Sequence, residues 1–455
     1  MNITGKHSKG SFITDGLPPN LLIFCYLSLS SIPLFLAALQ GLPLRALPNE
    51  FASAFGLLGF TWMLLSFLLS GRFRTISGRI GIDKTMSLHQ LMAIVLGVLI
   101  LLHPYLYTLS LNNPLPWDTT RQFSLLLTIP AFISGMLAWV LLPTLVITAV
   151  FRDQFPFRYE VWRWFHGIGA AVVVLASAHH VLEVGRYSNS TLMKGFWLAL
   201  IALASLTLLR SYLILPLLQK RRSLRVINVS PAATKTWHIT VKPDKNNGFK
   251  FKAGQFAWLK LKKNPFGLTE HPFSISSAPS DLPQLRFTIK ESGDFTNNIG
   301  TTLENSRAYI DGPHGHFIID DQEFDGVVMI AGGIGVAPMI SIIREMAQQN
   351  DPRPIRLLYG NRIESQIAFR DEIEEAAQKL KLEVDYILSE PPSNWEGLTG
   401  FIDAKNIEKS LAMPIPEKWL YLLCGPPVML DHVIPILELS GIPKNRILYE
   451  KFSYL

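Results

Sequence analysis

Cysteine and charge are both scarce in this chain of 455 residues. Its two cysteines, Cys25 and Cys424, lie in different halves of the sequence, which excludes a disulfide framework and a four-cysteine zinc or iron–sulfur site. Charged residues make up 17% of the chain and hydrophobic residues 49%, which is too apolar for an ordinary soluble enzyme. No basic run is interleaved with aromatic residues, so the net charge of +7 does not indicate a nucleic-acid partner.

Long hydrophobic runs fill the first half of the chain and are missing from the second half. Six segments are long enough to cross a hydrocarbon core of about 30 Å; they fall near 20–40, 51–70, 86–109, 123–150, 165–184 and 195–218. Basic residues concentrate in alternate loops, as the positive-inside rule requires of cytoplasmic loops. The sequence therefore predicts a multi-pass protein of the cell membrane, embedded in the lipid bilayer, with both termini in the cytoplasm.

Histidines are placed at matching positions in the third and fifth apolar segments. His89 and His103 are fourteen residues apart, and so are His166 and His180. On a helix this spacing returns a side chain to within about 40° of the same face, about 21 Å further along the axis. Histidine is a common axial ligand of heme iron, and ionisable groups inside membrane spans are usually functional. The pattern predicts two b-type hemes; the alternative is histidines that are merely solvated or packed at helix ends.

The direction of the two spans decides which histidines would pair. Both spans run from the cytoplasm outward, so His89 and His166 would hold an inner heme, and His103 and His180 an outer one. His179 is thirteen residues from His166 and points about 140° away from its face on an ideal helix. We favour His180 over His179, although a bend in the helix would reverse the choice.

The pattern changes after Ser223 to short alternating strands separated by glycine, proline and asparagine turns, which predicts a small antiparallel β-barrel. From Asp325 onward, apolar strands alternate with amphipathic helices, which predicts a parallel α/β sheet. The expected protein is an all-α six-helix transmembrane bundle (1–220) followed by the β-barrel (221–322) and the α/β domain (323–455).

Several short motifs in the second half suit bound nucleotides. His271-Pro272-Phe273-Ser274 opens a strand, and GDFT (293–296) and DGPHG (311–315) follow it. Phe273 is flat enough to lie against a flavin ring, and Ser274 can hydrogen-bond it; taken alone, each motif is equally an ordinary strand or turn. The segment 332–338, GGIGVAP, joins a strand to a helix, where a dinucleotide phosphate can bind, and CGPP (424–427) ends a later strand at the same rim.

Taken in this order, the motifs of the second half resemble the ferredoxin–NADP reductase superfamily. The whole chain resembles the transmembrane ferric reductases and NADPH oxidases, because six spans with paired histidines precede those motifs. The resemblance implies that FAD is surrounded by His271, Pro272, Phe273 and Ser274, with Thr296 near its pyrophosphate. It also implies that Gly332, Gly333, Gly335 and Pro338 shape the NAD(P)H site.

The resemblance further assigns residues to the hydride path. Cys424 would border the nicotinamide, Glu450 would lie beside the path, and Phe452 would cover the flavin ring, with Tyr454 as an alternative. Together with Ser274 these form the expected catalytic group. Arg362 follows a strand where relatives choose between NADH and NADPH, and it favours NADPH slightly because arginine suits a 2′-phosphate.

The function implied by this resemblance is electron transfer from NAD(P)H through FAD and two hemes to an acceptor outside, either O2 with release of superoxide or a ferric chelate. Two alternatives remain open: a membrane flavin reductase that acts on a quinone or a redox partner, and a heme-free, membrane-anchored redox sensor. No protein partner is indicated. Arg121 or Arg186 could attract an anionic acceptor or a heme propionate, or could be ordinary interfacial arginines.

Overall fold

The structure is a computed structural model that describes residues 16–70, 73–109, 130–156, 158–245, 248–261, 264–302, 304–320, 322–411 and 418–451. It divides into two compact units, which we call the helical unit (Met1–Ile214) and the sheet unit (Leu215–Leu455). The three domain boundaries expected from the sequence stay a prediction.

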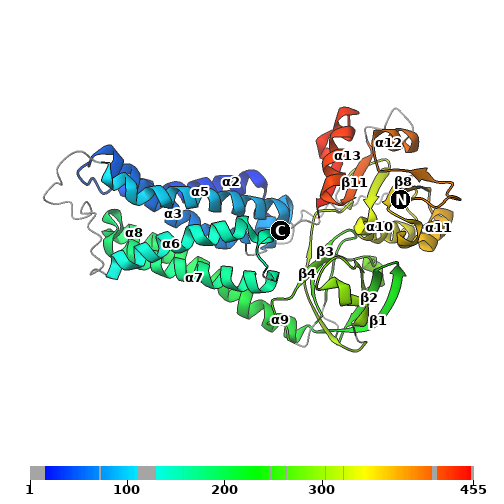
Figure 1. Cartoon of the computed structure of the whole chain (residues 1–455), viewed down its shortest axis with the longest axis horizontal. Coiled ribbons are helices and arrows are strands. Elements are labelled where there is room, and N and C mark those ends of the chain that lie inside the picture. The colour runs from blue at the N-terminus through cyan, green and yellow to red at the C-terminus, as the bar shows by residue number, and fades with distance from the viewer. Residues whose placement is uncertain are drawn as a thin grey trace, which may run out of the picture. The chain divides into compact units, whose positions relative to one another are not determined.

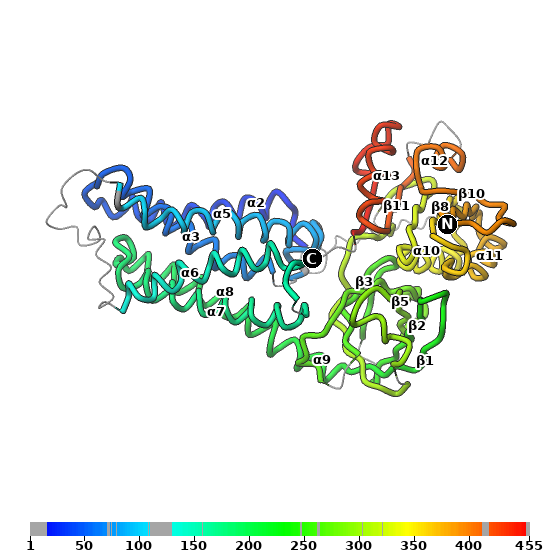
Figure 2. Tube along the Cα trace, in the orientation of Figure 1, coloured from blue at the N-terminus to red at the C-terminus, as the bar shows by residue number. Residues whose placement is uncertain are grey.

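The helical unit consists of long apolar helices that lie side by side (Figures 1 and 2). In chain order its elements are α2 (Pro19–Ala38), α3 (Leu47–Ser70), α4 (Arg74–Ile80), α5 (Ile82–Thr108), α6 (Pro130–Val150), η2 (Arg152–Gln154), α7 (Tyr159–Val184), η3 (Arg186–Asn189), α8 (Thr191–Leu209) and the π-helical turn η4 (Arg210–Ile214). In the described part of the chain, six helical stretches are long and apolar enough to cross a membrane. The predicted multi-pass membrane protein is thus confirmed, whereas the cytoplasmic placement of the termini stays a prediction.

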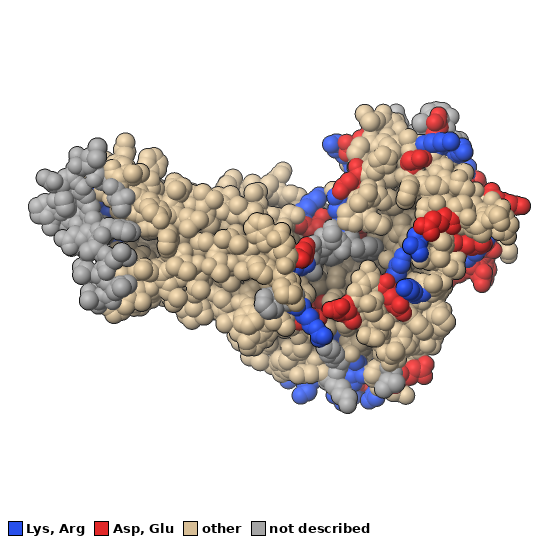
Figure 3. Space-filling model, viewed as in Figure 1, with Lys and Arg blue, Asp and Glu red and all other residues tan. Residues whose placement is uncertain are grey.

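The helical unit buries a small core and turns much of its apolar surface outward. Trp197 of α8 is fully buried and packs on Phe60 of α3, with ring centroids 5.0 Å apart. In contrast, Phe24 and Leu175 are 67% and 69% exposed. On the face shown in Figure 3, charged side chains are sparse over this unit and gather on the sheet unit. Such an apolar surface is stable in lipid, where the backbone hydrogen bonds of the helices are satisfied internally.

Two helices extend beyond the apolar runs that predict them. The fifth spanning helix, α7, begins at Tyr159 instead of 165, and the sixth span continues through η4 into α9 (Leu215–Arg221). Both extensions contain basic residues. Hydrophobicity alone locates the part of a helix that is in lipid, but helical hydrogen bonding continues wherever the flanking residues allow it.

The first half of the sheet unit is a six-stranded antiparallel sheet in the order β4-β3-β6-β1-β2-β5. The strands are β1 (Leu224–Ala233), β2 (Thr236–Pro243), β3 (Phe256–Lys260), β4 (His271–Ser274), β5 (Leu285–Lys290) and β6 (Arg307–His314). A single bridge between Ile275 and Phe287 connects the two edge strands. The antiparallel sheet is confirmed, and its complete closure into a barrel stays a prediction.

The second half of the sheet unit is a parallel sheet in the order β10-β9-β8-β7-β11-β12 with helices between the strands. Its elements are β7 (Val327–Gly332), α10 (Val336–Gln348), β8 (Ile355–Asn361), α11 (Arg370–Lys379), β9 (Leu382–Leu388), β10 (Leu398–Thr399), α12 (Ala404–Ser410), β11 (Leu420–Gly425), α13 (Pro427–Leu439) and β12 (Ile447–Lys451). The strand order reverses between β7 and β11, and ligands of open α/β sheets bind at such a point.

Candidate functional site

A cavity of about 390 Å³ lies inside the helical unit, and His103 and His180 both line it. His103 is on α5 and His180 on α7, near the ends of two helices that the sequence predicts to run in the same sense. The cavity walls are largely apolar, with Phe60, Leu96 and Leu142 among them. Its volume is in the range of ligand pockets, about 300–1,000 Å³. The structure therefore brings together the two histidines that the sequence assigns to the outer heme.

Backbone carbonyl groups orient both rings. Nδ1 of His103 is 2.6 Å from the carbonyl oxygen of Ala52, and Nδ1 of His180 is 2.9 Å from that of Ala131. Histidines that ligate metals usually donate their second ring N–H in this way, which fixes the tautomer and leaves Nε2 for the metal. The donor set fits a heme iron with two axial imidazole ligands.

Glycines make room for the two rings. A Cβ atom on Gly56 would lie 2.9 Å from Cε1 of His103, and a Cβ atom on Gly135 would overlap Nδ1 of His180. Each imidazole therefore packs against bare backbone of a neighbouring helix. Any side chain at either glycine would displace the ring.

The other predicted pair, His89 and His166, lies on the same two helices, α5 and α7. His89 of α5 lies near the backbone of Ser66, and the ring of His166 stacks on Trp162, with centroids 5.1 Å apart and an interplanar angle of 27°. Within the described residues, no cluster of three or more histidine, cysteine, aspartate or glutamate side chains could hold a metal ion. Heme ligation by two histidines at each level stays a prediction.

His179, the alternative to His180, faces elsewhere. Its exposed ring has Nδ1 2.9 Å from the hydroxyl of Ser134, and it does not line the cavity. The helix places neighbouring side chains about 100° apart, so only one of the two histidines can point into the cavity.

A polar group adjoins the cavity; Ser53, Tyr107, Arg186 and Tyr187 line it, and Arg45 and Glu50 contact these residues. Glu50 accepts hydrogen bonds from Arg45 and Tyr187, and Nη1 of Arg186 lies 3.7 Å from it. Sequence reasoning considered Arg186 but not Arg45, Glu50 or Tyr187. The available signal was Glu50 itself, which directly precedes the second apolar run, because a carboxylate at the end of a membrane span needs partners.

In the sheet unit, the first two flavin motifs come together around aromatic rings. The ring of Phe295, from the GDFT motif, lies 4.3 Å from that of His271 and 6.2 Å from that of Phe273. Ser274 is buried, and its Oγ has no hydrogen-bond partner among the described residues. An unpaired buried hydroxyl beside an aromatic surface fits a polar, planar ligand such as a flavin, because leaving it unpaired costs free energy. Pro272 lies between the two ring-bearing residues of β4.

The remaining flavin residues have local roles. The hydroxyl of Thr296 accepts a hydrogen bond from the backbone N–H of Ser292 at 2.8 Å and so caps its own turn. The third motif is held by β3, since Phe256 pairs with both Ser274 and His314. All three motifs thus meet along one side of the antiparallel sheet.

The glycine turn at the end of β7 lies against β11 at the switch point. A Cβ atom on Gly335 would overlap the carbonyl of Cys424, and one on Gly332 would lie 2.7 Å from Sδ of Met429. Gly333 differs, because it has a φ of +54° and an open position beside it. Pro338 is buried in the first turn of α10. Two of the three glycines are therefore explained by packing, and Gly333 is the one that leaves space for a ligand.

Cys424 is fully buried, between Ala331 and Glu450 on the neighbouring strands. Burial raises the pKa of its thiol, and the nearby Glu450 raises it further. Both effects favour the neutral thiol over the thiolate. Glu450 is 7% exposed and approaches Gly315. Phe452, Tyr454 and Arg121 lie outside the described residues.

Lys290 is a candidate residue that sequence reasoning missed. It ends β5, and its Nζ would lie 4.0 Å from a Cβ atom on Gly333. The Lys290 ammonium group therefore lies next to Gly333, the glycine of this turn that has space beside it. Its strand was predicted from the sequence, but the approach of β5 to this turn was not. Arg362 is 62% exposed, with its Nε 3.7 Å from Glu390.

Comparisons with known proteins match both halves of the chain. Residues 55–177 match the family described as ferric reductase like transmembrane component, and residues 329–434 match the oxidoreductase NAD-binding domain. The chain is 30% identical over 242 residues to the reductase component of propane 2-monooxygenase from Mycolicibacterium goodii, covering 50% of this chain and 66% of that protein. It is 36% identical over 159 residues to NADH-cytochrome b5 reductase 1 from Lodderomyces elongisporus, covering 34% and 53%.

The chain therefore spans just under two thirds, or less, of these two relatives. Among solved structures, the chain is similar to the cytochrome b5 reductase domain of Ulva prolifera nitrate reductase, with 22% identity, a TM-score of 0.46 and coverage of 51% of this chain and 98% of that one. The two family matches lie in the order that the sequence motifs predict. The chain thus joins a segment that matches the ferric reductase like transmembrane component to a segment that matches the oxidoreductase NAD-binding domain.

Proposed function

We propose that the chain carries electrons from NAD(P)H through FAD and two b-type hemes to an acceptor on the outer side of the membrane, either O2 or a ferric chelate. The observation that carries this proposal is the cavity between His103 and His180. Both rings are held by backbone carbonyls through Nδ1, and both pack on glycine. A heme-free scaffold would have no use for two histidines oriented in this way.

The residues of each half would position these groups. Bound flavin would accept two electrons as hydride and release them singly to heme, which carries one at a time. Ser274 would hydrogen-bond the flavin, and the rings of Phe273 and Phe295 would bound its site. Gly333 and Lys290 would receive the dinucleotide phosphates, and Cys424 and Glu450 would border the nicotinamide.

The polar group beside the cavity supports an anionic or strongly polar acceptor. Arg45 and Arg186 both contact the carboxylate of Glu50, and Arg186 also lines the cavity. Arg186 also donates to the carbonyl of Pro43 at 2.5 Å, so its guanidinium is held in place. For the coenzyme, Arg362 supports NADPH, whereas the neighbouring Glu390 and the name NADH-cytochrome b5 reductase of one relative support NADH.

The deciding experiment is a dithionite-reduced minus oxidised absorbance spectrum of the detergent-purified protein, with heme and flavin quantified per chain. We expect two b-type hemes and one FAD. Flavin without heme would contradict the proposal and favour a heme-free redox sensor. If heme is present, dye reduction that disappears with superoxide dismutase separates an oxidase from a ferric-chelate reductase.

Replacing Lys290 by alanine should weaken coenzyme binding. A hydrogen bond to a charged group contributes about 1.5–3 kcal/mol, so we expect the KM for NAD(P)H to rise about tenfold or more, with FAD content unchanged. Steady-state flavin reduction with NADH and with NADPH measures the effect and also gives the coenzyme preference. Lys242→Ala, an exposed lysine on β2, is the matched control. An unchanged KM in Lys290→Ala would remove this residue from the coenzyme site.

A further inference from the structure

One side of helix α10 is polar and faces the antiparallel sheet. Ser341, Arg344, Glu345 and Gln348 occupy it at helical spacing, so their side chains point the same way. The helix begins at Val336, directly after the glycine turn of the candidate dinucleotide site. Any group that hydrogen-bonds to the polar side of α10 therefore has a fixed position relative to the glycine turn.

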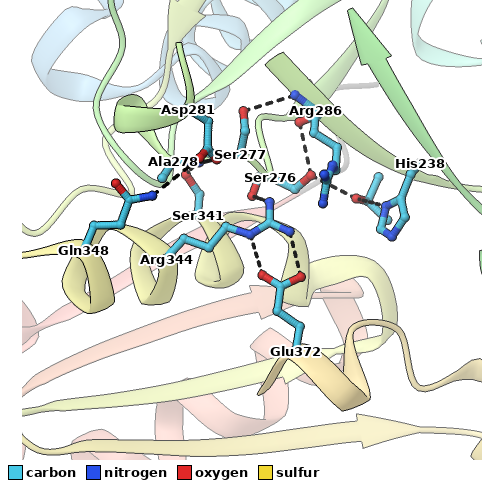
Figure 4. Close-up of polar contacts among 11 residues, drawn as sticks. His238, Ser276, Ser277, Ala278, Asp281, Arg286, Ser341, Arg344, Gln348 and Glu372 are labelled. Carbon is cyan, nitrogen blue, oxygen red and sulfur yellow. Dashed lines mark hydrogen bonds and ion pairs between the residues drawn. The ribbon is translucent and has the colours of Figure 1, made fainter. Parts of the chain in front are cut away.

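The first two residues of this side, Ser341 and Arg344, bind main-chain carbonyls just after strand β4 (Figure 4). Oγ of Ser341 donates to the carbonyl of Ser277 at 2.6 Å, and Nη1 of Arg344 donates to the carbonyl of Ser276 at 2.6 Å. Ser341, Ser276 and Ser277 are each at most 3% exposed. Buried hydrogen bonds of this kind fix geometry, because breaking one leaves an unsatisfied group.

The other two residues of this side, Glu345 and Gln348, make weaker contacts with the residues that follow Ser277. The hydroxyl of Ser280 donates to Glu345 at 3.1 Å, and Nε2 of Gln348 lies 3.5 Å from Asp281. These two contacts are exposed and contribute less than the buried pair.

The segment that α10 binds, Ser276 and Ser277, directly continues β4, which carries Phe273 and Ser274. The hydroxyl of Ser276 also hydrogen-bonds to β5: it lies 2.9 Å from the hydroxyl of Thr288 and donates to the carbonyl of Arg286 at 3.1 Å. The carbonyl held by Arg344 is therefore only two residues from the unpaired hydroxyl of the candidate flavin site. A rigid path of three residues joins that site to α10.

Arg344 is itself fixed on its far side. Its Nη2 donates to Oε2 of Glu372 on α11 at 2.7 Å, and its Nε donates to Oε1 of the same carboxylate, which makes a two-point contact. Such bidentate pairs set the plane of the guanidinium. The guanidinium also lies 5.7 Å from the ring of Phe369. Arg344 thus connects α10 and α11 of the parallel-sheet half to the segment that follows the flavin strand.

We propose that Ser341 and Arg344 are positioning residues that set the distance between nicotinamide and flavin. The inference rests on the proposed function, since it needs both sites to be occupied as described there. Hydride transfer requires reacting atoms about 3–3.5 Å apart, and a displacement of about 1 Å can cost about a hundredfold in rate. Two hydrogen bonds, from the helix that starts at one site to the segment that continues the strand forming the other, control that distance.

The test is stopped-flow reduction of FAD by NAD(P)H in the full-length protein, with variants Ser341→Ala, Arg344→Leu and Arg344→Lys. We expect the limiting rate of flavin reduction to fall about tenfold or more in Ser341→Ala and Arg344→Leu, with FAD content and coenzyme Kd nearly unchanged. Nicotinamide–flavin charge-transfer absorbance should weaken in parallel. Arg344→Lys keeps one donor and should recover part of the rate. Ser341→Ala decides the case if Arg344→Leu does not retain flavin.

Arg370→Leu is the matched control. Arg370 also forms two ion pairs, with Glu364 and Glu374, but both partners belong to the same half of the sheet unit. Equal limiting rates in Ser341→Ala, Arg370→Leu and the wild type would overturn the inference while leaving the proposed function intact. A wild-type protein whose flavin NAD(P)H does not reduce would instead contradict the proposed function itself.

Discussion

Replacing His103 or His180 by alanine is expected to remove one of two hemes and to reduce electron delivery to the acceptor to background. The two rings face the same cavity, and each is oriented by a backbone carbonyl, so removing either ring removes one of the two proposed axial ligands. Reduction of the flavin by NAD(P)H should continue at the wild-type rate, because the flavin residues lie in the sheet unit. Heme content per chain, the redox difference spectrum and acceptor reduction measure the three parts of this result.

His179→Ala is the matched control for that experiment. Its ring is the sequence neighbour of His180, but it is exposed and bonded to Ser134. It should retain both hemes and full acceptor reduction. Loss of a heme in His179→Ala together with full heme content in His180→Ala would reverse the assignment. Two hemes in His103→Ala would contradict the outer heme site altogether.

A methyl group at Gly335 should abolish coenzyme-dependent reduction. The added Cβ would overlap the carbonyl of Cys424, which belongs to strand β11 and is held by pairing on both of its sides. Because backbone on both sides must move, the turn between β7 and α10 shifts, and a shift of about 1 Å can cost about a hundredfold in rate. We expect NAD(P)H-dependent flavin reduction to fall by about that factor in Gly335→Ala, measured by flavin bleaching under anaerobic conditions.

Dithionite reduction of the hemes should be unaffected in Gly335→Ala, which separates a local defect from general unfolding. Gly441→Ala controls for backbone strain alone, since Gly441 has a φ of +87° but no atom within 4 Å of an added Cβ. It should reduce flavin at nearly the wild-type rate. Wild-type rates in Gly335→Ala would show that the turn tolerates displacement and would argue against its place in the coenzyme site.

Local patterns were enough to predict the helices and strands that carry the candidate sites. Apolar length marks the spanning helices, and alternating strands followed by strands and helices mark the two sheets. The fourteen-residue spacing puts His89 and His103 on one face of α5, because helix geometry follows from chain distance alone. The choice of His180 over His179 came from the same geometry, and the structure places only His180 at the cavity.

Contacts between distant residues were beyond such reasoning. Glu50 and Tyr187 are 137 residues apart, and Arg344 is 68 residues from the carbonyl it binds. No repeating pattern in the sequence relates the two residues of either pair. The sequence identifies Lys290 only as the last residue of a strand, and the structure shows that its side chain approaches Gly333.

The sequence by itself determined the membrane bundle, the order of the two sheets, the matching histidines and the glycine turn, since each depends on periodicity or on residue type within one segment. Only the tertiary structure decided which carbonyls orient His103 and His180. It also decided which glycines pack closely against neighbouring atoms, which glycine has space beside it, and how α10 hydrogen-bonds to the segment after the flavin strand. The physical reason is that packing distances depend on how separate segments meet, and the free energy of those contacts is shared between residues far apart in the chain.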